Sequence, residues 1–299
     1  MSLISLLIAL AAERYLSSSA WQFGTHFSKY KAFFTGVIRI GKPQQSLVAN
    51  ALFILLPVIT CYLLLGLVDD GLLHFLLSTL ILISCFGCIK TRDTFKQYLL
   101  CAFRGEQTSC DMHYQQLLQD KNLPDIGFGQ TLIWLNYRYF IAIMLFFVIF
   151  GAPGALAYRL ISRVNEQATE REQDKLHNIE QENDEQQPFT EKIDASQEVA
   201  QFNQQLLFWL DWLPVRIVAF GYMLVGHFSR AMPTWLENLF DIGKLPHQIL
   251  VSVAEKSEDF MVDHSDCTAE PCLLVRLAKR TLLLCLAIIS LLILTGVMS

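Results

Sequence analysis

Charged side chains are what this sequence has least of. Of its 299 residues, 17% are charged and 53% are hydrophobic, whereas soluble domains typically carry about 25% charged residues. This shortage of water-facing groups argues against an ordinary soluble domain. We therefore expect the lipid bilayer to be the main partner of the chain, and we expect no nucleic-acid partner.

Frameworks of disulfides or metal ligands are also missing. Four of the eight cysteines lie in apolar runs, where a thiol is most often a small buried side chain. Cys85 and Cys88 form a CxxC pattern, but neither a second pair nor a nearby histidine cluster completes a zinc site. We expect no bound metal and no other cofactor.

A cleavable secretory signal is the third absence. Residues 1–12 are apolar, but they have neither a basic start nor a convincing small-residue cleavage site. We interpret them as the start of a first membrane helix that continues to about Ala20. Glu13 and Arg14 follow directly, and ionisable side chains at membrane depth usually mark a site or an internal ion pair.

What the sequence does have is a set of long apolar runs. The central one, residues 139–163, has no charge in its first half and then breaks at Gly151, Pro153 and Gly154. Inside a bilayer a broken backbone needs protein or a water-filled cavity to satisfy the freed carbonyls. Two interpretations stay open: an irregular tip beside a polar site, or the turn at which the helix leaves the membrane.

Other apolar runs complete the fold prediction. Residues 47–68 and 72–89 are joined by two acids and a glycine, which predicts an antiparallel hairpin. Residues 281–297 form a last span, and residues 206–228 supply a further crossing. The sequence therefore predicts an all-α, polytopic helical membrane protein with about six membrane segments, of which four are clear from hydropathy alone.

The run at residues 206–228 carries Asp211 and Arg216 inside it. Because Pro214 is tolerated only in a first helical turn, we predict that Asp211 is the N-cap of a helix over residues 212–225. This helix should end at Gly226.

Basic residues set the predicted orientation. Residues 17–46 contain four basic side chains and no acid, which is typical of a cytoplasmic segment. The short hairpin then places residues 90–138 on the same side. There the 3.6-residue apolar stripe of residues 91–104 predicts an amphipathic helix, and residues 113–119 a second short one.

Composition divides the chain into three parts. Residues 1–163 are an N-terminal membrane region, and residues 206–299 are a C-terminal one. Residues 164–205 between them are rich in Glu and Gln, so they should be a linker that is either disordered or a solvated helix.

Polar side chains next to or inside the apolar runs are the candidate site. A charge at the bilayer centre costs about 2.5–3.5 kcal/mol on insertion scales unless it is paired. We therefore predict one polar cluster between the helices, with Glu13 paired to Arg216. The alternative is that each side chain reaches the headgroups separately. The predicted members are Glu13, Arg14, Tyr158, Arg159, Asp211 and Arg216.

Several motifs make the chain resemble the CobD/CbiB family of inner-membrane proteins. They are GAPGALAYR at residues 151–159 and DWLPVR at 211–216, with ERYL at 13–16, IWLNYRYF at 133–140 and LVGHFSRAMPTW at 224–235. The resemblance implies that Gly151, Pro153, Gly154, Trp212 and Pro214 are structural residues of the family motifs.

One branch of the resembled family is an enzyme that makes adenosylcobinamide phosphate from an amino alcohol with ATP and magnesium. That reaction needs acids and amides around the phosphates and the metal. Here Leu207 and Phe208 stand where that branch has two acids, and Asp211 takes an asparagine position. Residues 134–138 and 162–167 depart from its pattern as well, which argues against the synthase reaction.

Three functions follow from the resemblance. We favour a non-catalytic, multi-pass signalling modulator in the bacterial inner membrane, because another branch of the family is linked to β-lactamase induction in the response to β-lactams and cell-wall damage. Its partners would be the bilayer and a cytosolic muropeptide amidase pathway. The alternatives are a membrane binder or carrier of a muropeptide-like or nucleotide metabolite, and a drifted adenosylcobinamide-phosphate synthase.

Overall fold

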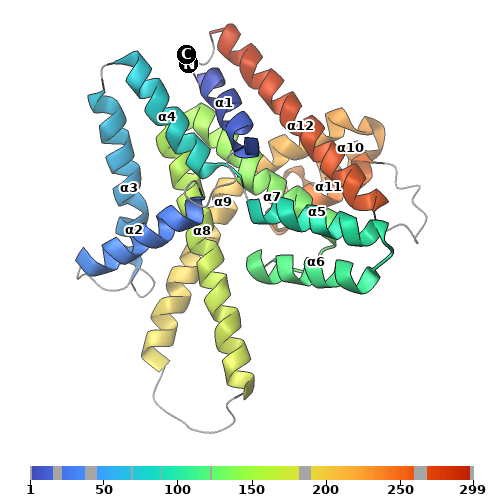
Figure 1. Cartoon of the computed structure of the whole chain (residues 1–299), viewed down its shortest axis with the longest axis horizontal. Coiled ribbons are helices and arrows are strands. Elements are labelled where there is room, and N and C mark those ends of the chain that lie inside the picture. The colour runs from blue at the N-terminus through green and yellow to red at the C-terminus, as the bar shows by residue number, and fades with distance from the viewer. Residues whose placement is uncertain are drawn as a thin grey trace. The chain divides into compact units, whose positions relative to one another are not determined.

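The computed structural model describes residues 2–15, 22–37, 46–68, 70–87, 89–121, 123–181, 190–258 and 268–296, without certain side chains, among them Arg14 and residues 170–196. The described residues form helices and no strand, which confirms the all-α fold (Figure 1). The helices are α1 (Ser2–Tyr15), α2 (Phe23–Val37), α3 (Leu47–Leu67), α4 (Gly71–Cys85), α5 (Ile89–Phe103), α6 (Gln107–Lys121), α7 (Phe128–Asn136), the π-helical turn η2 (Tyr137–Ile141), α8 (Ala142–Gln181), α9 (Thr190–Val225), α10 (Phe228–Leu239), α11 (Pro246–Ser257) and α12 (Ala269–Leu294).

Among the residues described, four helical segments are long and apolar enough to cross a membrane, as expected for a polytopic membrane protein. They are Leu47–Leu67, Phe128–Thr169, Gln197–Val225 and Ala269–Leu294. A fifth arises if α4 and the bent continuation through α5 count as one span. Helix α1 is apolar but shorter, and its predicted continuation to Ala20 falls on residues outside the described ranges.

Several predicted elements are confirmed. The hairpin exists, because α3 ends at Leu67 and α4 begins at Gly71. The central run does break at Gly151, whose φ of 70° and ψ of −163° interrupt α8. The amphipathic stripe is helix α5, and the second short helix is α6, which is longer than predicted.

Other boundaries were predicted wrongly. Asp211 is not an N-cap, because α9 already begins at Thr190 and runs through it. Likewise α12 begins at Ala269 rather than near residue 281, since Arg and Lys end an apolar run without ending a helix. The basic segment at residues 17–46 contains helix α2, and the polar stretch before α12 contains helix α11.

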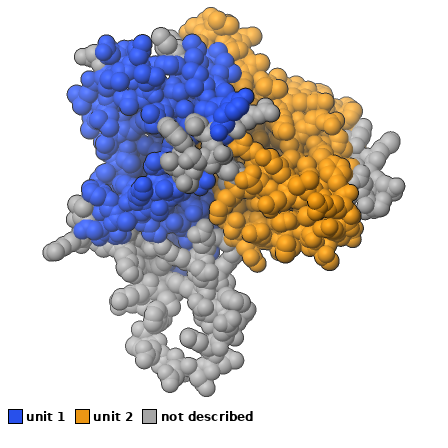
Figure 2. Space-filling view, viewed as in Figure 1, with its two compact units in different colours: residues 1–85, 149–209 blue, residues 86–148, 210–299 orange. Residues whose placement is uncertain are grey.

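The chain forms two compact units (Figure 2). Unit 1 consists of Met1–Cys85 and Ile149–Trp209, and unit 2 of Phe86–Val148 and Leu210–Ser299. Helices α8 and α9 therefore each contribute to both units. The compositional boundaries at residues 163 and 205 lie inside these two helices, so they do not mark the ends of helical elements.

In unit 1, α1 packs against α4, and α2 packs against α3 through aromatic rings. Phe53 is the centre of this contact, with the rings of Tyr30, Phe27 and Phe34 at 4.8, 5.7 and 5.1 Å from its own. The Tyr30 hydroxyl also donates to the Phe53 carbonyl at 2.9 Å. Burial raises the pKa of Tyr30 to about 12, so this hydroxyl keeps its proton.

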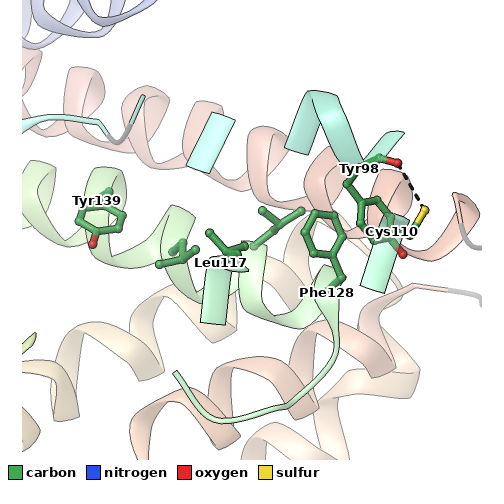
Figure 3. Close-up of a cluster of buried hydrophobic side chains, with 7 residues drawn as sticks. Tyr98, Cys110, Leu117, Phe128 and Tyr139 are labelled. Atoms are coloured by element: carbon green, nitrogen blue, oxygen red, sulfur yellow. Dashed lines mark hydrogen bonds between the residues drawn. The ribbon is translucent and has the colours of Figure 1, made fainter. Parts of the chain in front are cut away.

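In unit 2, α12 packs along α7, and side chains of α5 and α6 form a buried cluster with Phe128 of α7 (Figure 3). The Phe128 ring lies flat against Tyr98, with centroids 3.7 Å apart, and edge-on to Tyr114 at 5.8 Å. The Cys110 thiol contacts the Tyr98 carbonyl at 3.7 Å in the same cluster. This packing attaches the amphipathic α5–α6 pair firmly to the start of a membrane helix.

Candidate functional site

The break at Gly151 begins the first half of the candidate site, in unit 1. A φ of 70° is costly for a residue with a Cβ, which explains the glycine. Pro153 follows where the helix restarts, and there a missing amide proton leaves no bond unmade. Gly154 and Ala155 are buried next to it, so small side chains let neighbouring segments come close.

Beyond the break, one face of α8 buries polar side chains. Arg159, Ser162 and Glu166 are 6%, 0% and 4% exposed, and their spacing of three and four residues places them on one side of the helix. Arg163 donates to the Glu166 carboxylate at 2.8 Å. The oxygens of Ser162 and Asn165 are buried and have no hydrogen-bond partner among the described residues.

Helix α2 lies along this polar face. The Arg159 guanidinium lies over the Phe23 ring, 5.2 Å from its centroid, in a cation–π contact. Eight residues further along both helices, Lys31 donates to Gln167 at 2.8 Å. Both contacts join α2 to this part of α8. We call the residues between them the α2–α8 seam: Phe23, Lys31, Arg159, Ser162, Arg163, Glu166 and Gln167.

The other predicted residues of unit 1 lie on two helices. Tyr158 is 1% exposed and stands next to Arg159 on α8. Glu13 is half-buried near the end of α1. The side chain of Arg14 lies outside the described residues, so its place in a cluster stays a prediction.

The second half of the candidate site lies in unit 2, around Asp211. This carboxylate is 2% exposed and accepts a hydrogen bond from the Tyr137 hydroxyl at 2.8 Å. Tyr137 is the first residue of the π-helical turn η2. Such turns carry one extra residue, are rare, and often occur at functional sites. The turn thus joins the start of the central membrane helix to the middle of α9.

Arg216, one turn and a half further along α9, binds backbone carbonyls. Its Nε donates to Leu239 at 2.6 Å, and its two terminal nitrogens donate to Trp212 and Asp241 at 2.7 Å each. The guanidinium carbon also lies 4.1 Å from the centroid of the Trp212 ring. Arg216 is 4% exposed, and these contacts engage three of the five donors of its guanidinium. Pro214 lies within the helix between Trp212 and Arg216.

The predicted cluster thus falls on two units. Glu13, Tyr158 and Arg159 belong to unit 1, whereas Asp211 and Arg216 belong to unit 2. The pairing of Glu13 with Arg216 stays a prediction.

Sequence reasoning missed Tyr137, Lys31, Ser162 and Glu166. The last two follow Arg159 at helical spacing, which was an available signal. Tyr137 and Lys31 lie far in the sequence from their partners Asp211 and Gln167, so these contacts could be identified only from the structure.

These groups form hydrogen bonds that hold helices together. Each half contains hydrogen bonds between segments far apart in the chain. Tyr137–Asp211 and Asn50–Asn203, the latter at 2.7 Å, are buried, and Lys31–Gln167 is partly buried. Within the described part of the chain, no three His, Cys, Asp or Glu side chains gather as metal ligands would.

Comparison with known proteins supplies the family. A family model described as "Regulatory signalling modulator protein AmpE" matches residues 1–299. Protein AmpE of Shigella flexneri is 26% identical over 228 residues, which cover 73% of this chain and 72% of that protein. No solved structure matches the chain significantly.

Proposed function

The chain belongs to the AmpE family of regulatory signalling modulators, and we propose that it acts in the bacterial inner membrane, as a multi-pass protein, in the response to β-lactams and cell-wall damage. The observation that carries this proposal is the family match over the entire chain. Its partners would be the bilayer itself and a cytosolic pathway that contains a muropeptide amidase.

We further propose that the chain modulates without catalysing a reaction. Asp211 stands at a motif position of the resembled synthase branch, and here it is bonded to Tyr137. Arg216 is occupied by three backbone carbonyls. Groups that hold helices together in this way support a conformational role rather than an open catalytic centre.

A deletion strain with an inducible β-lactamase tests the proposed pathway. β-Lactamase activity is measured with and without a sub-inhibitory β-lactam, in the parent, in the deletion, and in the deletion complemented with the chain. We expect the deletion to change the induced level and the chain to restore it. Identical induced and basal levels in all three strains would overturn the proposal.

The non-catalytic part has its own test. The chain is expressed in a strain that lacks its cobinamide-phosphate synthase and is grown on the corrinoid precursor. We expect no growth, with an authentic synthase as the positive control. Growth restored by the chain would show that the synthase reaction survives.

A further inference from the structure

Helix α10 folds back along the end of α9. The Trp235 indole donates to the Arg216 carbonyl at 3.1 Å, and its ring lies 5.2 Å from that of Phe220. Since α10 starts at Phe228, directly after α9 ends at Val225, contacts with residues 216 and 220 of α9 require the two helices to be antiparallel. The segment Gln197–Val225 of α9 is one of those long and apolar enough to cross a membrane.

Helix α11 then returns to the point where α10 began. The His227 amide donates to the Ser257 carbonyl at 2.8 Å, which joins the start of α10 to the end of α11. Gly226 makes this approach possible, because a Cβ there would meet the Ser257 carbonyl and lie 2.8 Å from the Ser257 Cβ. The two helices therefore form a closed hairpin with its tip at residues 240–245.

Several polar groups at the tip are bonded within the protein. The carbonyls of Leu239 and Asp241 accept from Arg216, and the Gly243 amide donates to the Asp241 carboxylate at 2.9 Å. Lys244 donates to Asn238 at 2.7 Å. A loop in water has no need of such bonds, whereas a loop in hydrocarbon must satisfy its backbone internally. The Arg216 guanidinium, which binds the carbonyl of the last residue of α10, also complements the dipole of that helix.

The outside of this hairpin carries a row of apolar side chains, beside the exposed charged residues Glu237 and Lys244. Lys244 is paired with the Asp241 carboxylate at 3.9 Å. Phe228, Met232 and Leu236 recur every four residues along α10 and are 40–48% exposed. At the tip Phe240 is 81% exposed and Ile242 is 58% exposed. The α9 span also exposes apolar side chains, including Ile217 and Leu224.

Hairpin length decides how such a surface can be covered. Twelve residues of α10 reach about 18 Å at 1.5 Å per residue, and the hydrocarbon core is about 30 Å thick. Neither α10 nor α11 can cross it. Given the proposed membrane location, we infer that α10 and α11 form a re-entrant hairpin that dips into the bilayer beside α9 and leaves on the side where it entered, with lipid chains around Phe240 and Ile242.

Depth is measured on the full chain in lipid vesicles. A small fluorophore is attached through p-azidophenylalanine, one position at a time, at Phe228, Phe240 or Ile217. Lipids with a nitroxide quencher near the headgroup or deep in the acyl chain are then compared. We expect the deep quencher to act more strongly on the probes at Phe240 and Ile217, and the shallow quencher on the probe at Phe228.

The probe at Ile217 separates two failures. If it is quenched from the deep position while the probe at Phe240 is quenched only from the shallow one, α9 is in the membrane and the re-entrant hairpin is refuted. If neither quencher affects the probe at Ile217, the proposed membrane location itself fails, and the hairpin with it.

Sidedness provides the second measurement. The azide is placed at the exposed positions Arg230 and Lys256, near the two open ends of the hairpin, and is reacted with a membrane-impermeant alkyne in spheroplasts and in inverted vesicles. We expect both positions to react in the same preparation. Reaction in opposite preparations would make the hairpin a crossing and overturn the inference.

Discussion

The Tyr137 hydroxyl and the Asp211 carboxylate are joined by a hydrogen bond of 2.8 Å, across 74 residues of sequence. Asp211 is 2% exposed, so water cannot replace this donor. We expect Tyr137→Phe to lower the free energy of unfolding by about 1–3 kcal/mol, the usual loss when a buried polar group loses a partner. Thermal unfolding in detergent micelles measures it. Tyr62→Phe, at a 69% exposed position of α3, is the matched control, and equal melting temperatures for the two variants would contradict the expectation.

Arg216 should not tolerate lysine. A guanidinium reaches its three carbonyls at once, whereas an ammonium is a compact point charge. We expect Arg216→Lys to destabilise the protein by about 1.5–3 kcal/mol, the scale of a hydrogen bond to a charged group. The control is Arg280→Lys at an exposed position of α12. A lysine variant at 216 that unfolds like the wild type would show that the carbonyl contacts add nothing.

Gly226 and Gly66 should respond oppositely to alanine. At Gly226 a Cβ meets the backbone of Ser257, while at Gly66 nothing lies within 4 Å. We expect Gly226→Ala to cost about 1–3 kcal/mol, as overpacking usually does. Gly66→Ala, inside α3, should be neutral or stabilising by up to about 1 kcal/mol. Both are compared by thermal unfolding. A Gly226→Ala variant as stable as the wild type would mean that α9 and α11 do not approach so closely.

Asn50 and Asn203 should be energetically coupled. They are 1% exposed each and share a hydrogen bond of 2.7 Å between α3 and α9. Either change to leucine leaves the other amide unpaired, which costs about 1–3 kcal/mol, whereas the double change removes both polar groups. The double variant should therefore be more stable than the sum of the single effects by at least about 0.5 kcal/mol. Simple additivity would refute the pair.

The predicted pairing of Glu13 with Arg216 has a similar test. The carbonyls around Arg216 accept from three of its donors, and a second carboxylate besides that of Asp241 would stabilise its charge further. Glu13→Gln and Arg216→Gln should then be non-additive in stability by at least about 0.5 kcal/mol. Additive effects on stability would refute the pairing of Glu13 with Arg216.

Local signals were enough for some of the fold. Two acids and a glycine mark the turn between α3 and α4, and the break in α8 is visible because only glycine readily adopts a φ of 70°. The end of α9 at Val225 was also predicted from a glycine, since Gly226 follows it. Gly226 has no positive φ, however, and its structural role is the close approach of Ser257.

Sequence patterns gave wrong predictions where a residue's partners lie far away in the chain. Asp211 and Pro214 have the composition of a helix start, yet the helix passes through them, and Asp211 bonds to Tyr137 instead. The sequence predicted an acidic partner for Arg216. Two of its acceptors are instead backbone carbonyls that lie 23 and 25 residues later in the chain. No pattern in the sequence reports which carbonyls a loop will leave unpaired.

The position of these acceptors also orders the synthesis of the protein. When α9 leaves the ribosome, Arg216 is already present, but Leu239 and Asp241 are not yet made. Until the following hairpin has emerged, the Trp212 carbonyl is the one of these three acceptors that the guanidinium can reach. The stability that Arg216 gives to α9 thus depends on a segment translated after it, so chains truncated between residues 226 and 239 should lose that stability.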